Sequence, residues 1–272
     1  MKTPRKSVVR SATLTLKKAL SMVTMPEMPG SGRLLIRKFD VGRFQEDITP
    51  QRLARKLQRQ VESLRYAAVR IDAPSAGRAD AIALRDDAEA SVELVRRLTR
   101  HHAPREWFWP MAVPGVASSQ TPQKLVQAAL RAMMGSSSFA PALEIIVAQL
   151  VQTNHAEWLF DLLDPIGPIV IEYLRIHQLP LHASALNAQR LSTPRHHAAS
   201  VVMSDPWGSV LREYIPRWSA RDGRAVWLAA LAIRNGPPPS LHSNFASVIH
   251  HVVQLAAQPS ASQPPDTTES KQ

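Results

Sequence analysis

Apolar residues recur with a helical period over most of the chain. Between residues 50 and 65 they fall every three or four positions, which is the spacing of one helix face. Thr49 and Pro50 precede this pattern, and a threonine N-cap followed by proline at the first helical position is a typical helix start. The outer face of the predicted helix carries four cationic residues, Arg52, Arg55, Lys56 and Arg59.

Two short β-rich runs flank this helix. Residues 33–41 precede it, and residues 67–72 follow it and are stopped by Pro74 and Gly77. Strand, helix and strand within about 40 residues predict a small α/β unit. A further helix is predicted over residues 79–101, because acidic residues lie toward its start and arginines toward its end, which complements the helix dipole.

From residue 121 onward the pattern predicts short helices joined by short connections. Thr121-Pro122 repeats the cap-and-proline start, Pro141 opens the next helix, and Asn154 can cap a short one. Further helices are predicted over residues 169–176, 205–216, 224–234 and 240–256, and residues 178–204 are expected to form a loop. The predicted fold is mainly α, with a small N-terminal α/β (strand-helix-strand) unit followed by a multi-helix bundle of short helices.

The same features divide the chain into four segments. We expect a basic flexible arm over 1–32, an α/β unit ending in an aromatic-proline turn over 33–116, a helical domain over 117–256 and a disordered tail over 257–272. For the arm, the other interpretation is one short amphipathic helix built on Val8, Leu14, Leu16 and Leu20.

Charge is concentrated at the start of the chain. The formal net charge is +11, and residues 1–110 hold 22 Lys and Arg against 12 Asp and Glu. Such an excess is compatible with nucleic acid, anionic lipid or an acidic protein as the partner. It is equally compatible with high arginine usage that serves no binding function.

Residue types that carry catalysis are either missing or unfavourably spaced. The chain has no cysteine, which excludes disulfides and thiolate chemistry and fits a reducing, cytoplasmic compartment. Its histidines cluster as neighbouring pairs, whose side chains diverge by about 100° on a helix and so rarely share a metal. Phosphate-binding glycine loops and nucleophile elbows do not occur. We therefore predict no catalytic, cofactor-binding or metal-binding residue, no cofactor and no enzymatic activity.

Membrane and secretion signals are also lacking in the sequence. No apolar run approaches the roughly 20 residues that a membrane span requires. The basic start has no continuous apolar segment, so no signal peptide is predicted.

One segment concentrates aromatic residues. Trp107, Phe108 and Trp109 are consecutive and Pro110 follows them. Because Pro110 and Pro114 prevent a helix from running through the segment, we expect a turn whose rings pack either inward or against a partner.

The order of these pieces resembles the N-terminal region of the tape-measure proteins of contractile injection systems. The resemblance is carried by LLIRKFDVGRF, TPQRLARKLQRQVESL, VRRLTRHHAPREWFWPMAVPG and EIIVAQLVQTNHAEWLFDLLDP, and covers about residues 33–175, with RAVWLAALAI as a fainter match. It implies a role in assembling a phage-tail-like particle, with Trp107, Trp109 and Pro110 at matching positions. A length ruler needs a long extended segment, which this chain lacks, so the resemblance implies a short relative or an accessory protein.

Two functional hypotheses follow. The first is a non-enzymatic structural or assembly protein that contacts other proteins through Trp107, Phe108, Trp109 and Pro110 and through its apolar helices. The second is a nucleic-acid-binding protein that uses the basic first third, with the cationic residues of the helix over 50–65 on phosphates. For that helix, the simpler interpretation is an ordinary solvated face, since Glu62, Glu46 and Asp47 dilute its charge.

Overall fold

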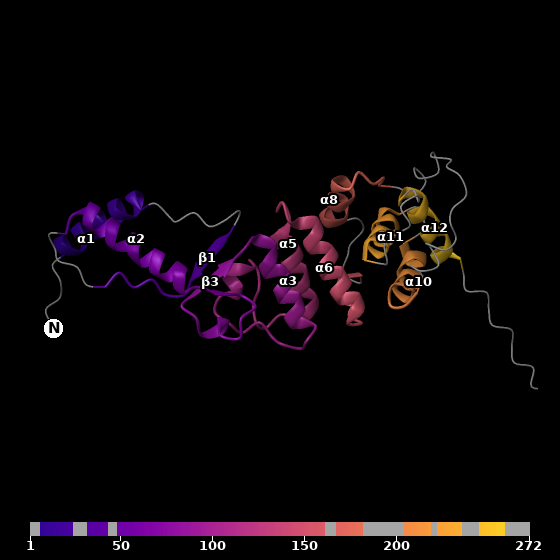
Figure 1. Cartoon of the computed structure of the whole chain (residues 1–272), viewed down its shortest axis with the longest axis horizontal. Coiled ribbons are helices and arrows are strands. Elements are labelled where there is room, and N and C mark those ends of the chain that lie inside the picture. Colours follow the sequence, from indigo (N-terminus) through magenta and orange to yellow (C-terminus); the bar gives the residue numbers. More distant parts are fainter. Residues whose placement is uncertain are drawn as a thin grey trace, which may run out of the picture. The chain divides into compact units, whose positions relative to one another are not determined.

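The computed structural model describes residues 6–23, 32–42, 48–160, 167–181, 204–218, 222–235 and 245–258. Within these residues the fold is mainly α with a small α/β unit near the N-terminus, as the sequence predicts, and the sheet of that unit has three strands (Figure 1). None of the described helices is long and apolar enough to cross a membrane. The chain forms two compact units, Met1–Ala142 and Leu143–Gln272, which are described separately below.

The first unit begins with two helices that pack on each other, α1 (Lys6–Met22) and α2 (Pro50–Ala67). Thr49 caps α2, with Pro50 in its first turn, as the sequence predicts. Residues 6–22 of the expected flexible arm form helix α1, which agrees with the other interpretation, a short amphipathic helix. An isolated helix of this length is marginal in water, and α1 gains its stability by burying Ala19 against Leu53 and Leu57 of α2.

The sheet has the order β1-β3-β2, with β1 (Arg33–Ile36), β2 (Val69–Arg70) and β3 (Ala81–Leu84). The central strand β3 pairs antiparallel with β1 and parallel with β2. A single 3₁₀ turn, η1 (Ala76–Arg78), lies between β2 and β3.

The expected helix over 79–101 is therefore two elements, β3 and α3 (Asp87–Leu98). Burial accounts for the strand, because Ala81, Ile82 and Leu84 lie between two neighbouring strands in the core. Asp86 separates the two elements, and its carboxylate accepts hydrogen bonds from the backbone N–H groups of Ala88 and Glu89 as the N-cap of α3.

The first unit also includes α4 (Trp109–Ala112) and α5 (Pro122–Met133), the latter packed on α3. The Ser91 hydroxyl of α3 donates to the Ala129 carbonyl of α5 at 2.9 Å, and the Ser138 hydroxyl donates to Asp86 at 2.8 Å. These contacts explain why the first unit extends to Ala142, whereas the sequence places a domain boundary near residue 116.

The second unit consists of helices throughout its described part. They are the remainder of α6 (Phe139–Gln152), then α7 (Glu157–Phe160), α8 (Pro168–Ile176), α10 (Trp207–Trp218), α11 (Gly223–Asn235) and α12 (Phe245–Ala257). Helices α10, α11 and α12 pack pairwise, and α8 packs on α11 (Figure 1). From Ala225 to Ile233, α11 is buried on all sides, which matches its continuously apolar sequence.

Two details of this unit differ from expectation. Asn154 does not begin α7: it has a φ of 59° and ends α6, where the N–H of His155 donates to the Leu150 carbonyl at 2.8 Å. Helix α10 continues past Pro216 to Trp218, because Pro216 is exposed while Ile215 and Trp218 pack inward. The predicted helix start at residue 240, most of the 178–204 loop and the tail after 258 lie outside the described residues.

Candidate binding surfaces

The aromatic-proline turn is divided between the core and the surface. Phe108 and Trp109 are completely buried, Trp107 is partly buried, and Pro110 is exposed. The Phe108 ring lies 4.9 Å from the Trp109 ring and 5.7 Å from the Trp107 ring, measured between centroids. Phe108 and Trp109 therefore hold the turn in place, and the side chains that remain accessible are part of Trp107, Pro110 and the neighbouring Met111.

A one-turn helix forms where the prolines were expected to keep the segment non-helical. Helix α4 begins at Trp109, so Pro110 occupies its first turn, where no backbone N–H is needed for the helix. Pro114 lies beyond the end of α4, so the helix does not run through both prolines, in agreement with the sequence argument.

Glu106 anchors the buried tryptophan. Its carboxylate accepts a hydrogen bond from the Trp109 indole N–H at 2.7 Å and pairs with the Arg97 guanidinium, which lies over the Trp109 ring at 5.5 Å. Burial raises the pKa of Glu106, but the hydrogen bond from Trp109 and the charge of Arg97 outweigh it, so the pKa lies below its usual range.

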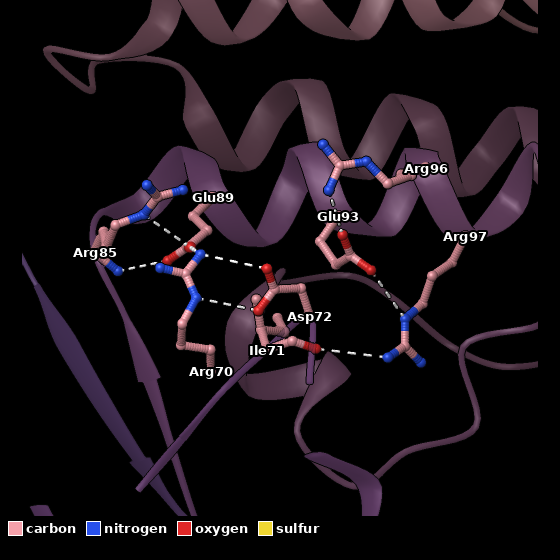
Figure 2. Close-up of polar contacts among 8 residues, drawn as sticks. All are labelled: Arg70, Ile71, Asp72, Arg85, Glu89, Glu93, Arg96 and Arg97. Carbon is pink, nitrogen blue, oxygen red and sulfur yellow. Dashed lines mark hydrogen bonds and ion pairs between the residues drawn. The ribbon is translucent and has the colours of Figure 1, made fainter. Parts of the chain in front are cut away.

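Arg97 belongs to a network of charges along α3 (Figure 2). Glu93 accepts from Arg96 at 2.9 Å and from Arg97 at 3.3 Å, and Arg97 also donates to the Ile71 carbonyl at 3.5 Å. One turn earlier, the nearly buried Glu89 accepts from Arg70 at 2.8 Å and from the Arg85 side chain at 2.9 Å.

The backbone N–H of Arg85 adds a third hydrogen bond to Glu89, at 2.6 Å. Arg70 in turn bonds Asp72, and this hydrogen bond lowers the pKa of the Asp72 carboxyl. Because each of these arginines engages a carboxylate of the same unit, the network fixes the end of β2 and the start of α3 and offers little unbalanced charge to a ligand.

The outer face of α2 has a different character. Arg52, Arg55 and Arg59 are all exposed, on the side opposite the buried Leu53 and Leu57. Among the described residues, none of the three guanidinium groups forms an ion pair or a side-chain hydrogen bond. The three are therefore a cationic surface that is open to a partner.

Lys56 departs from this group. The position of a Cβ added at Gly42 would lie only 3.3 Å from the Lys56 ammonium nitrogen, so this side chain extends to the loop before α2. Of the four cationic candidates on α2, three arginines form the exposed track and the lysine lies at its edge.

In the described part of the second unit, side chains of α6, α8 and α11 form a polar cluster. The Tyr173 hydroxyl donates to Glu144 at 2.9 Å, and Arg234 donates to Nδ1 of His177 at 2.9 Å. Nε2 of His177 lies 3.5 Å from the Glu144 carboxylate, and the Arg234 guanidinium lies 3.6 Å from it. Sequence reasoning missed this cluster because its members are far apart in the chain.

Burial dominates the protonation of this cluster. It raises the pKa of Tyr173, and the Glu144 carboxylate adds to that effect. Burial also lowers the pKa of His177, helped by the Arg234 charge and opposed by Glu144. A tyrosine with a raised pKa and a neutral histidine, each engaged with Glu144 or Arg234, suit a structural tie between three helices.

The neighbouring histidine pairs show no such arrangement. His101 has a φ of 58° and ends α3, where the N–H of His102 donates to the Arg97 carbonyl at 2.9 Å. Within the described residues, no three His, Asp or Glu side chains are grouped so that they could hold a metal ion. His196 and His197 lie outside those residues.

Comparisons of the chain with protein-family models, with curated proteins and with solved structures give no significant match.

Proposed function

We propose that this chain is a non-enzymatic protein that acts by binding other proteins in an assembly. The observation that carries the proposal is the aromatic-proline turn. The buried Phe108 and Trp109 hold the turn in place. Trp107, Pro110 and Met111 remain at least partly accessible, and Met111 has 41% of its surface exposed. An accessible apolar surface that buried rings hold in place loses little entropy on binding, so it suits a protein contact.

The test removes the exposed Met111 and the partly buried Trp107, and leaves the fully buried Phe108 and Trp109 in place. The double variant Trp107→Ala, Met111→Ser is compared with Ile171→Ser. This control removes an apolar side chain of α8 that is about as exposed as Met111. Tagged proteins are used to capture partners from cells that express the chain naturally. We expect the turn variant to lose a partner that the wild type and Ile171→Ser retain, with unchanged circular dichroism.

Equal capture by all three proteins would exclude the turn as the contact. Trp109→Ala serves as the reference for a core defect, because removing a buried tryptophan costs about 3–5 kcal/mol of stability.

We propose further that the assembly is a contractile injection system, in which this chain is a component or an accessory protein acting in the cytoplasm. The support is the resemblance over residues 33–175 to tape-measure proteins. A ruler role does not suit it: the longest described helix, α2, has 18 residues and so spans only about 27 Å. The expected result is co-purification with sheath and tube proteins, and neighbouring sheath, tube and baseplate genes in the genome.

A second candidate function is nucleic-acid binding, favoured by the three exposed arginines of α2. Phosphate contacts by these side chains predict an affinity that falls steeply with salt concentration. Fluorescence anisotropy with mixed-sequence DNA and RNA at low salt tests this directly. No binding at low salt would eliminate the candidate and leave the assembly proposal untouched.

A further inference from the structure

An exposed tyrosine continues the arginine track of α2. Tyr66 has 88% of its surface exposed, which is the highest value among the exposed large apolar and aromatic side chains of the described residues. It is the second-last residue of α2, seven residues after Arg59.

The four side chains lie on one line along the helix. At about 100° per residue, Arg52, Arg55, Arg59 and Tyr66 fall within an arc of about 60°, on the side opposite Leu57. The rise from Arg52 to Tyr66 is about 21 Å. The surface is therefore a narrow track with three guanidinium groups and one aromatic ring at its end.

The chemistry of the track favours nucleic acid over other acidic partners. Guanidinium groups form two hydrogen bonds to a phosphate. An anionic membrane would require large aliphatic side chains beside the cations, and α2 exposes none, whereas α1 exposes Leu14, Leu20 and Met22. An acidic protein offers carboxylates to the arginines but has no bases to stack on the exposed ring.

The ring also distinguishes single strands from duplexes. In a duplex the base faces are stacked on one another, so a tyrosine beside a phosphate-binding track cannot reach them. In a single strand the bases are free to stack on an aromatic side chain while the backbone follows the cations.

We propose that the outer face of α2 binds single-stranded nucleic acid, with Arg52, Arg55 and Arg59 on the phosphates and Tyr66 stacked on a base. This inference rests on the second proposed function and specifies its substrate class. Glu62, the one carboxylate of α2, is only partly exposed and lies beside the line rather than on it.

The experiment measures anisotropy of fluorescein-labelled 20-nucleotide oligo(dT) and of a 20-base-pair DNA duplex with the full chain. Wild type should bind oligo(dT) more tightly than the duplex. Tyr66→Ala should weaken oligo(dT) binding about tenfold, and Tyr66→Phe should bind like wild type, because stacking needs the ring and not the hydroxyl. Neither change should alter the salt dependence.

A triple variant separates the phosphate contacts from the stacking. The variant Arg52→Ala, Arg55→Ala, Arg59→Ala loses three phosphate contacts. Because each contact on a single strand contributes about 0.7 to the slope of log K against log salt, the magnitude of the slope should fall by about 2. The matched control removes three exposed arginines that already pair with carboxylates, Arg33, Arg175 and Arg217. Its slope should stay near that of wild type although its net charge is the same as that of the triple variant.

The outcomes are separable. Absence of binding to either DNA overturns both this inference and the second proposed function. Equal binding of duplex and oligo(dT), with no effect of Tyr66→Ala, keeps nucleic-acid binding but overturns the single-strand assignment. Equally tight binding of poly-glutamate or of phosphatidylglycerol vesicles, through the same arginines, would identify a general polyanion surface and also overturn it.

Discussion

Two regions of the first unit carry arginines that differ in their ion pairing. Around α3, Arg85 just before the helix and Arg96 and Arg97 within it engage the carboxylates of Glu89 and Glu93, whose side chains are only 9–10% exposed. On α2, the three outer arginines have no such partner among the described residues, because the helix carries a single carboxylate. The comparison teaches that the number of arginines does not identify a binding surface. What identifies it is whether carboxylates of the same fold already neutralise them.

The largest effect that separates the regions is expected at Glu89. Glu89→Ala removes charged hydrogen bonds to Arg70 and Arg85 and should cost about 2–3 kcal/mol. Glu62→Ala on α2 should change stability by less than about 0.5 kcal/mol. Native-state hydrogen exchange of the α3 amides measures the first effect and that of the α2 amides the second. Equal costs at the two glutamates would contradict the distinction.

The helix caps give the next difference. Asp86 accepts from two backbone N–H groups at 2.8 and 3.0 Å and from the Ser138 hydroxyl, whereas Thr49 accepts one N–H at 3.4 Å in an exposed position. Asp86→Ala should therefore cost about 1–2 kcal/mol and Thr49→Ala about 0.5 kcal/mol. Urea unfolding followed by circular dichroism compares them, with Asp86→Asn as the conservative control.

Acid should weaken the α3 region selectively. Asp72 and Glu106 have lowered pKa values in the fold, so their stabilising contribution is complete above the usual carboxyl range and is lost as pH falls through the lowered values. Hydrogen exchange of α3, compared between neutral and acidic pH, should show this loss. Glu106→Gln should reduce the pH dependence, and an unchanged profile would contradict the role of Glu106.

The smallest effect on stability is expected for the exposed arginines of α2. Arg52→Ala, Arg55→Ala, Arg59→Ala should leave the stability of the fold within about 0.5 kcal/mol of wild type, because these exposed side chains have no described ion pair to lose. Thermal unfolding of the triple variant checks this. A large loss of stability would show that the arginines are structural after all.

Local signals made several elements predictable. Thr49-Pro50 and Thr121-Pro122 begin α2 and α5 where expected, because a cap side chain and a proline act on the adjacent backbone alone. The strand β3 was not predicted, since the apolar run AIAL fits a helix or a strand equally well and only pairing with β1 and β2 decides between them.

The candidate surfaces were only partly predictable. The four cationic residues of α2 follow from helix periodicity, but the divergence of Lys56 toward Gly42 depends on a loop elsewhere in the fold. Tyr66 was not singled out, because nothing local distinguishes an exposed tyrosine from a buried one. The cluster of Glu144, Tyr173, His177 and Arg234 could not be predicted, as its members come from three helices.

The sequence by itself determined the mainly helical class, the caps and the concentration of positive charge in the first part of the chain. These depend on periodicity, on neighbours along the backbone and on composition. Only the tertiary structure decided that α1 is a packed helix, that Phe108 and Trp109 lie in the core, and that the arginines of α3 are neutralised while those of α2 are not. Each of these depends on which distant residues meet, because burial and ion pairing are properties of contacts and not of single positions.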